Sequence, residues 1–283
     1  MAEATIGPFR LLRRVGAGAS GEVFLAHAAT PERRVADAAA PERRVALKLY
    51  RVPHDELTAD AVQRFESEVQ LLRRLRHPGI VEIIDAGLWQ QRPWLAMAWL
   101  PGHDLSRYTT PARLLPEPLV LHIGEQIARA LAHLHRHGVV HRDVKPGNVR
   151  VHLPTSSAVL TDFGIARAGD GVQTDTGVVP GSPAFMAPEL LAGAAPDAAS
   201  DLYALGVNLF QLLSARLPFE ATSMGELLRR AAHDEAPTLD RLRPGVAPAL
   251  TALVARLLAR RHDERAADAA AVAEALRALR ETA

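Results

Sequence analysis

The sequence predicts an α+β fold of two lobes, a β-rich N-lobe with one main helix followed by a mainly α-helical C-lobe. Three observations lead to this prediction. The chain has 283 residues, which is enough for two hydrophobic cores. The first hundred residues alternate short β-type runs with one helical pattern, and after Pro101 the pattern changes to long helices.

The N-lobe elements follow from local patterns. Short β-type runs indicate strands at 9–15, 21–28, 44–50, 80–89 and 92–100. Between the third and fourth runs, apolar residues recur at helical spacing from Ala59 to Leu75. We therefore expect a lead at 1–8, the N-lobe at 9–98 and a hinge at 99–102.

The C-lobe elements are longer. Apolar residues at helical spacing predict helices at 118–137, 201–213 and 248–258. The run "SAVLTDFG" reads as a short apolar strand that ends at Asp162. We place the C-lobe at 103–283.

A short duplication lies inside the N-lobe. "PERRVADAAA" at 31–40 is followed directly by "PERRVALKLY" at 41–50, and Lys48 of the second copy corresponds to Ala38 of the first. We expect 31–42 to be a solvated extension of a hairpin loop, with a partner-binding element as the alternative.

Composition excludes several classes of protein. The 33 Lys and Arg residues nearly balance the 32 Asp and Glu residues, which gives no support to a nucleic-acid or membrane-surface partner. The chain has no cysteine, so disulfides and thiolate chemistry are excluded. Neither an apolar signal core nor a run of about eighteen apolar residues occurs. We expect a soluble cytoplasmic protein.

A glycine-rich stretch opens the N-lobe. "GAGASGEV" places Gly16, Gly18, Gly21 and Val23 in the pattern G-x-G-x-x-G-x-V. The same glycine spacing opens dinucleotide-binding folds, but there a helix follows, whereas "EVFLAHA" alternates like a strand. We therefore expect a hairpin lid over phosphates, with a glycine turn that binds nothing as the alternative.

Lys48 lies in the apolar strand "RVALKLY", where an unpaired ammonium group would be costly. Glu68, beside the apolar face of the helix at 59–75, is its candidate partner. Such a pair is either structural or, beside a phosphate lid, a means of positioning a nucleotide.

The stretch "HRDVKPGNVR" at 141–150 concentrates polar groups between two apolar segments. Asp143 within it and Asp162 downstream are two carboxylates, with Asn148 between them. A carboxylate and a carboxamide that converge on one site suit Mg²⁺, which also takes phosphate oxygens. A second carboxylate, free of metal, can orient a hydroxyl group and accept its proton. Two turn-forming aspartates are the alternative.

Together these motifs resemble those of a bacterial, eukaryotic-like serine/threonine protein kinase. They occur in that family's order and spacing, from about Phe9 to the C-terminus: the glycine-rich loop, the lysine strand, H-R-D-x-K-x-x-N, D-F-G and A-P-E at 187–189. A pseudokinase scaffold and a small-molecule phosphotransferase of related fold are the alternatives. The full set of catalytic residues disfavours the first, and the glycine-rich and A-P-E motifs disfavour the second.

The resemblance implies a nucleotide site for ATP. The residues that it assigns to nucleotide binding are Gly16, Ala17, Gly18, Gly21, Val23, Ala46, Lys48, Met97, Trp99 and Arg150. The family usually has an apolar residue at the position of Arg150, so this arginine either stacks on the base or weakens nucleotide binding.

The resemblance also implies the catalytic roles. Lys48, paired with Glu68, contacts the ATP phosphates. Asn148 and Asp162 bind Mg²⁺, with Mn²⁺ as the alternative metal. Asp143 accepts the proton of the substrate hydroxyl, and Lys145 contacts the transferred phosphoryl group. His141 is expected to orient the loop rather than to exchange protons.

Regulation is expected in the activation segment at 162–189. Thr174 and Thr176 lie where related bacterial kinases are phosphorylated, and Arg142 and Arg167 are candidates to pair with such a phosphate. Ser182 replaces the threonine that the family usually has there. The resemblance implies protein substrates with Ser or Thr, and a homodimer for autophosphorylation in trans.

Two further residues are expected to brace the C-lobe. Asp201 matches the family's buried aspartate that supports the catalytic loop, and Arg265 matches the arginine that pairs with Glu189. In "HLHRHGVVH", His133 and His137 have helical metal-ligand spacing, but a third ligand is missing and a solvated helix face is the favoured interpretation.

Overall fold

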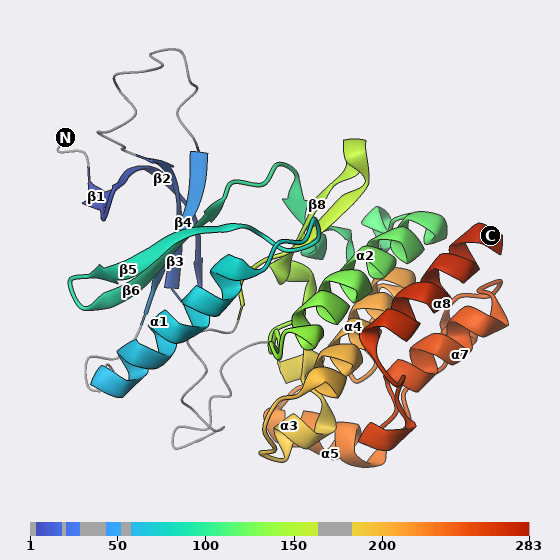
Figure 1. Ribbon diagram of the computed structural model, residues 1–283. Helices are drawn as coiled ribbons and strands as arrows, with labels where there is room; N and C mark the ends of the chain where they lie inside the picture. Colours follow the sequence, from blue (N-terminus) through green and yellow to red (C-terminus); the bar gives the residue numbers. More distant parts are fainter. Residues whose placement is uncertain (1–3, 19–20, 29–43, 52–57, 164–182, 283) are drawn as a thin grey trace. The chain divides into compact units, whose positions relative to one another are not determined.

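The computed structural model describes residues 4–18, 21–28, 44–51, 58–163 and 183–282. These residues form two compact units (Figure 1). The N-terminal unit takes 4–76 and 81–100, and the C-terminal unit takes 77–80 and 101–282 within these ranges. The four residues 77–80 thus group with the C-terminal unit although their chain neighbours on both sides belong to the other one.

A single antiparallel sheet forms most of the N-terminal unit, with strand order β1-β2-β3-β4-β6-β5. Its strands are β1 (Thr5–Ile6), β2 (Phe9–Gly18), β3 (Gly21–Ala28), β4 (Arg44–Tyr50), β5 (Ile83–Trp89) and β6 (Arg92–Ala98). The expected run at 80–89 begins as a strand only at Ile83, because Ile80 bridges to Leu160 of the C-terminal unit.

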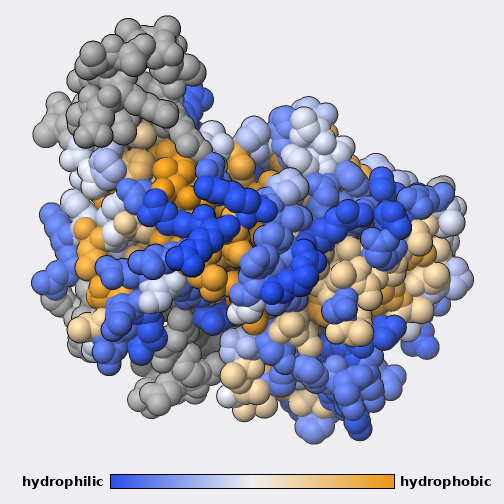
Figure 2. Space-filling view, viewed as in Figure 1, coloured by the Kyte–Doolittle hydropathy of each residue, from blue (hydrophilic) through white to orange (hydrophobic). Residues whose placement is uncertain are grey.

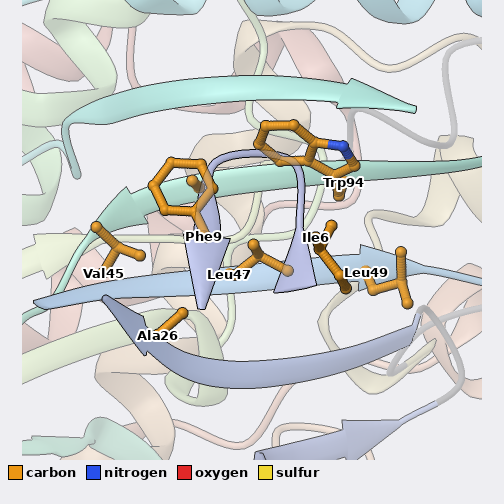
Figure 3. Close-up of a cluster of buried hydrophobic side chains, with 8 residues drawn as sticks. Ile6, Phe9, Ala26, Val45, Leu47, Leu49 and Trp94 are labelled. Atoms are coloured by element: carbon orange, nitrogen blue, oxygen red, sulfur yellow. The ribbon is translucent and has the colours of Figure 1, made fainter. Parts of the chain in front are cut away.

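One face of this sheet carries the apolar core of the N-terminal unit. Alternate residues of β4, Val45, Leu47 and Leu49, point to this face, as side chains along a strand must. The ring of Phe9 meets that of Trp94 edge to face at 5.6 Å (Figure 3). The other members of the cluster are Ile6, Ala26 and Ala96. Ile6, from the segment expected as a lead, is only 2% exposed, so the end of that segment packs as part of this unit.

The opposite face carries four of the residues assigned to nucleotide binding, Val23, Ala46, Lys48 and Met97. In the register of the strands, Val23 lies opposite Lys48, and Ala46 lies opposite Met97. Tyr50 is on the same face as Lys48, because the two residues are two apart on one strand. Its ring contacts Phe65 of helix α1 (Ala59–Arg74) at 6.0 Å and 75°, so α1 covers this face.

The C-terminal unit is mainly helical. Its helices are α2 (Glu117–Arg136), α3 (Pro188–Leu191), α4 (Ala198–Ser214), α5 (Met224–His233), α6 (Leu239–Leu242), α7 (Pro248–Leu257) and α8 (Ala269–Thr282). Helix α4 is buried over most of its length and packs against α2 and α7. A small antiparallel sheet of β7 (His103–Asp104), β8 (Val149–His152) and β9 (Ser157–Leu160) completes the unit.

Hydrophilic side chains cover much of the surface in view, and hydrophobic ones show among them on the N-terminal unit (Figure 2). The large apolar side chains that are exposed include Leu12, Val15, Leu71 and Leu88 of this unit. None of the helices in the described ranges combines the length and the apolar character that crossing a membrane requires.

Candidate functional site

The structure requires glycine at one of the three positions of the expected lid and not at the other two. Gly21 begins β3 at φ +141°, and a Cβ atom there would lie 2.2 Å from the carbonyl oxygen of Leu49, so the sheet itself requires glycine. Gly16 and Gly18 end β2, and a Cβ atom at either would meet nothing within 4 Å. Packing therefore does not demand glycine at these two positions, which flank Ala17 and leave its backbone open to close approach.

Three of the residues expected around the base share one sheet face. Val23, Ala46 and Met97 come from the adjacent strands β3, β4 and β6, and cross-strand neighbours lie side by side. Met97 is buried, whereas Val23 and Ala46 are half-buried. Trp99, just after β6, is also half-buried. These side chains offer an apolar surface next to Lys48.

Lys48 is buried at 6% exposure, and its Nζ atom lies 5.0 Å from the centre of the Tyr50 ring. This distance allows a cation–π interaction. The same ring contacts Phe65, and Glu68 lies three residues further along α1, on the neighbouring position of the same helix face. Tyr50 therefore joins the strand of Lys48 to the helix of Glu68. The sequence reading missed Tyr50, whose only signal was an aromatic residue two positions after the lysine.

In the C-terminal unit, Asp143, Lys145 and Asn148 form one hydrogen-bonded group. Lys145 Nζ and Asn148 Nδ2 both donate to Oδ2 of Asp143, each at 2.7 Å. Asn148 Nδ2 also lies 2.9 Å from the main-chain oxygen of Asp143. All three side chains come from the short loop after α2, so local contacts fix the direction of the Asp143 carboxylate.

Asp201 of α4 holds the backbone of this loop through hydrogen bonds. It is 1% exposed and accepts hydrogen bonds from the backbone N–H groups of His141 and Arg142, at 2.8 and 2.9 Å. His135 Nε2 contacts its Oδ2 atom at 2.9 Å. Arg142 takes a left-handed φ of +67°, a strained conformation that these contacts hold in place. The expected bracing role of Asp201 is confirmed.

His141 is fully buried, and its two ring nitrogens have different partners. Nε2 lies 3.1 Å from the carbonyl oxygen of Thr161, and Nδ1 receives the N–H of Asp143 at 3.4 Å. A carbonyl needs a donor and an N–H needs an acceptor, so the ring is a neutral imidazole with its proton on Nε2. Burial lowers the pKa of His141 below its ordinary value, against the charges of Asp201 and Asp143. This geometry supports a role in orienting the loop.

The loop also connects Asn148 to Asp162. The N–H and Oγ1 groups of Thr161 both donate to the main-chain oxygen of Asn148, at 2.8 and 3.1 Å. Asp162 follows directly, at a left-handed φ of +54°. Because Asn148 Nδ2 is used by Asp143, its Oδ1 atom is the one that remains to bind a ligand. A carboxamide oxygen beside a carboxylate fits a hard divalent cation that also takes phosphate oxygens.

Arg150 lies on β8, opposite Asp104 of β7 and Val159 of β9. Its strand neighbours Val149 and Val151 are buried, so Arg150 points to the other face of the small sheet and is half-buried there. The role of Arg150 in nucleotide binding stays a prediction.

Glu189 and Arg265 form a bidentate ion pair at 2.6 and 2.7 Å. The Arg265 side chain is fully buried and also donates to the carbonyl oxygens of Ala199 and Ala259. Its guanidinium carbon lies 5.0 Å above the ring of Tyr203, whose pKa burial raises. The expected pairing of Arg265 with Glu189 is confirmed.

Three histidines lie together at the boundary segment 77–80. The rings of His77 and His133 are 5.2 Å apart, and those of His133 and His137 are 4.5 Å apart. His137 Nδ1 is 2.8 Å from the carbonyl oxygen of His133. The sequence reading missed His77 as a neighbour of the other two. In the part of the chain that the structure describes, no cluster of three or more His, Asp or Glu residues has a metal-holding arrangement.

Several expected features lie outside the described residues. They are the loop at 31–42 and, in the activation segment, Arg167, Thr174, Thr176 and Ser182.

Comparison with known proteins identifies the family to which the chain belongs. Residues 9–277 match the family model described as the protein kinase domain. The chain belongs to the protein kinase domain family.

Individual relatives narrow the likeness to bacterial enzymes. The chain is 36% identical to the serine/threonine-protein kinase Pkn1 of Myxococcus xanthus over 95% of its length and 38% of the relative. It is 36% identical to the DNA damage-responsive serine/threonine-protein kinase RqkA of Deinococcus radiodurans, over 94% of the chain and 39% of the relative. For the serine/threonine-protein kinase PrkC of Bacillus subtilis the identity is 33%, over 90% and 38%. The chain thus spans about two fifths of the length of these relatives.

Proposed function

We propose that this chain is a protein serine/threonine kinase domain, which transfers the γ-phosphoryl group of ATP to Ser or Thr hydroxyls of proteins. The observation that carries the proposal is the Asp143–Lys145–Asn148 group, fixed by hydrogen bonds and held from below by Asp201. Phosphoryl transfer depends mainly on positioning and charge stabilisation, and this group supplies both.

Asp143 acts on the substrate hydroxyl. Its carboxylate orients the hydroxyl group and accepts its proton as the oxygen attacks phosphorus. Lys145, whose Nζ atom donates to Oδ2 of Asp143, would offset the negative charge of the transferred phosphoryl group. Lysine at this position favours Ser and Thr over Tyr as the accepting residue.

The protein kinase family uses ATP and a divalent metal. Asn148 Oδ1 and Asp162 would hold that metal, for which we propose Mg²⁺, with Mn²⁺ as the alternative. A divalent metal held by these two residues would neutralise negative charge on the phosphate groups. The hydrogen bond from Asn148 Nδ2 to Asp143 sets the orientation of the carboxamide, so its oxygen is presented for this purpose.

The N-terminal unit contributes the nucleotide contacts. Lys48 would contact the ATP phosphates while paired with Glu68, below the backbone of residues 16–18. Val23, Ala46, Met97 and Trp99 would surround the base. The open positions at Gly16 and Gly18 support this assignment, because glycine allows the backbone to approach a ligand closely. We further propose that Arg150 stacks on the base.

Activation would proceed by autophosphorylation of Thr174 and Thr176 in trans within a homodimer, with Arg142 as a partner for the phosphate. The domain would act on proteins in the cytoplasm, where ATP is available.

Incubation of the purified protein with labelled ATP and Mg²⁺, with and without a generic protein substrate, tests the proposal. We expect label on Ser or Thr, on Thr174 or Thr176 among other sites, and its loss in Asp143→Asn. Asp263→Asn changes an exposed aspartate that pairs with Arg261 and serves as the matched control, with unchanged labelling. If wild type binds ATP but labels nothing, the chain is a nucleotide-binding scaffold instead.

A further inference from the structure

Helix α4 contacts the loop at 141–148 through a second residue, Asn208, which lies seven residues after Asp201. Asn208 lies two turns along the helix and therefore on the same side as Asp201. Its side chain has no exposed surface at all. Asn208 belongs to none of the kinase motifs in the sequence, and the proposed phosphoryl transfer assigns it no role.

The amide of Asn208 is oriented without ambiguity. Its Nδ2 atom lies 3.2 Å from the carbonyl oxygen of Val144 and 2.6 Å from that of Ala204. Both partners are acceptors, so the NH₂ group must face them and Oδ1 must face away. Within the described part of the chain, this buried Oδ1 atom has no hydrogen-bond partner.

Asparagine at position 208 destabilises the folded state relative to an apolar residue. A buried amide oxygen without a partner destabilises the folded state, and asparagine is a poor residue for a helix interior. Leucine has a similar size and would avoid both costs, and most of its neighbours on α4 are apolar. The bond to Ala204 does not explain the choice, because that carbonyl can already accept from the helix backbone. The bond to Val144 is the contact that only a long donor at position 208 can make.

Val144 stands between Asp143 and Lys145 in the chain. We propose that Asn208 is a positioning residue for phosphoryl transfer, which acts by holding the Val144 carbonyl and thereby fixing the peptide from which Asp143 and Lys145 project. This inference rests on the proposed function of those two residues. Asp201 holds the N–H groups just before Asp143, and Asn208 holds the carbonyl just after it, so the loop is fixed on both sides of the reacting carboxylate.

Two substitutions separate the two bonds of Asn208. Asn208→Leu removes both. Asn208→Thr keeps a hydroxyl that can donate to the Ala204 carbonyl within the helix, but its side chain is too short to reach Val144. The matched control is Thr251→Val on α7, which also removes a buried polar atom without a hydrogen-bond partner, Thr251 Oγ1, outside the loop.

The measurements are kcat, KM for ATP, melting temperature and amide hydrogen exchange. We expect kcat to fall about three- to tenfold in both Asn208 variants, the kinetic equivalent of one hydrogen bond. KM should change by less than about twofold, because Asn208 has no part in nucleotide binding. Amide exchange should rise in residues 141–148 of both variants, while Thr251→Val leaves kcat and this exchange unchanged.

An effect on melting temperature alone, with wild-type kcat and wild-type exchange at 141–148 in Asn208→Thr, would overturn the inference and leave Asn208 a purely structural residue. Asn208→Thr keeps the test decisive if Asn208→Leu does not fold. Hydrogen exchange reads the loop without any turnover. A wild-type protein that lacks kinase activity would therefore contradict the proposed function, and faster loop exchange in the variants would still establish the contact with Val144.

Discussion

The two units hold their functional side chains by different means. In the N-terminal unit, Lys48 lies on a strand within an apolar sheet, with the face of Tyr50 beside its ammonium group. In the C-terminal unit, Asp143 is fixed by directional hydrogen bonds from side chains of its own loop, and Asp201 fixes the loop backbone. The position of Lys48 depends mainly on packing in the sheet, and that of Asp143 depends on directional hydrogen bonds.

This difference has a consequence for mutation. Apolar packing changes gradually when a side chain changes, because neighbouring groups can partly fill the space. A buried hydrogen-bond network fails abruptly, because each lost partner leaves a polar group unsatisfied in a region of low dielectric constant. We therefore expect the largest effects in the C-terminal unit and smaller ones around Lys48.

Asp201→Ala should have the largest effect. The substitution leaves the N–H groups of His141 and Arg142 and the His135 ring without their shared acceptor. We expect a loss of about 3–5 kcal/mol in the free energy of unfolding and at least a hundredfold fall in kcat, measured by urea unfolding and steady-state kinetics.

Asp197→Ala, at the N-cap of the same helix, is the matched control. It removes only the N-cap contact to Ser200 and the contact to His262, and should cost about 1 kcal/mol with kcat unchanged. Equal effects of the two variants on kcat would contradict the comparison.

Arg265→Lys should come next. Lysine keeps the charge but cannot form the two parallel bonds to Glu189 or reach the carbonyls of Ala199 and Ala259 together. We expect a loss of about 2–3 kcal/mol in unfolding free energy, measured by urea unfolding. Arg261→Lys is the control, since Arg261 pairs with Asp263 on the surface, and should leave the unfolding free energy unchanged within the error of the measurement. A loss below about 1 kcal/mol in Arg265→Lys would show that the directional bonds of this network matter no more for stability than ordinary packing contacts do.

The sequence predicted the elements and motifs better than the contacts between them. Strands β3 and β4 and helix α1 follow from local alternation and helical spacing, and each appears within one residue of its expected bounds. Strands β7 and β8 are too short to show such periodicity, and they form because β8 pairs with β7 on one side and with β9 on the other. His77 and Asn208 were missed for a related reason, because their partners His133 and Val144 lie far along the chain and nothing in their own neighbourhood marks them. Tyr50 was missed although it lies two residues after Lys48, because its contact with Phe65 exists only in the folded chain.

Tyr50→Leu and Tyr50→Phe test the N-terminal side of the comparison. Leucine removes the ring that faces Lys48 and contacts Phe65, whereas phenylalanine keeps it. We expect Tyr50→Leu to weaken ATP binding about three- to tenfold, equivalent to about 1 kcal/mol from the cation–π contact, and Tyr50→Phe to change it by less than about twofold. Calorimetric titration with ATP measures this without turnover. If leucine binds ATP as well as wild type, the aromatic ring of Tyr50 is not what positions Lys48.

Acid should weaken the C-terminal network through His141. Burial lowers the pKa of His141 from its ordinary value of 6.5, so between that value and the lower folded-state value the unfolded chain binds a proton that the folded protein does not. Stability contributed by the neutral ring is therefore present above pH 6.5 and is lost as the pH falls toward the folded-state pKa. From about pH 7 to about pH 5.5, this group accounts for up to about 1 kcal/mol of lost unfolding free energy. His141→Gln keeps a donor for the Thr161 carbonyl without titrating, and should reduce the pH dependence by that amount in urea unfolding.

His77 and His133, whose pKa values burial also lowers, are unchanged in this variant, so the difference between the variant and wild type isolates His141. An unchanged pH dependence would mean that His141 takes up its proton in the folded protein, and the neutral ring would then not be what connects Thr161 to Asp143.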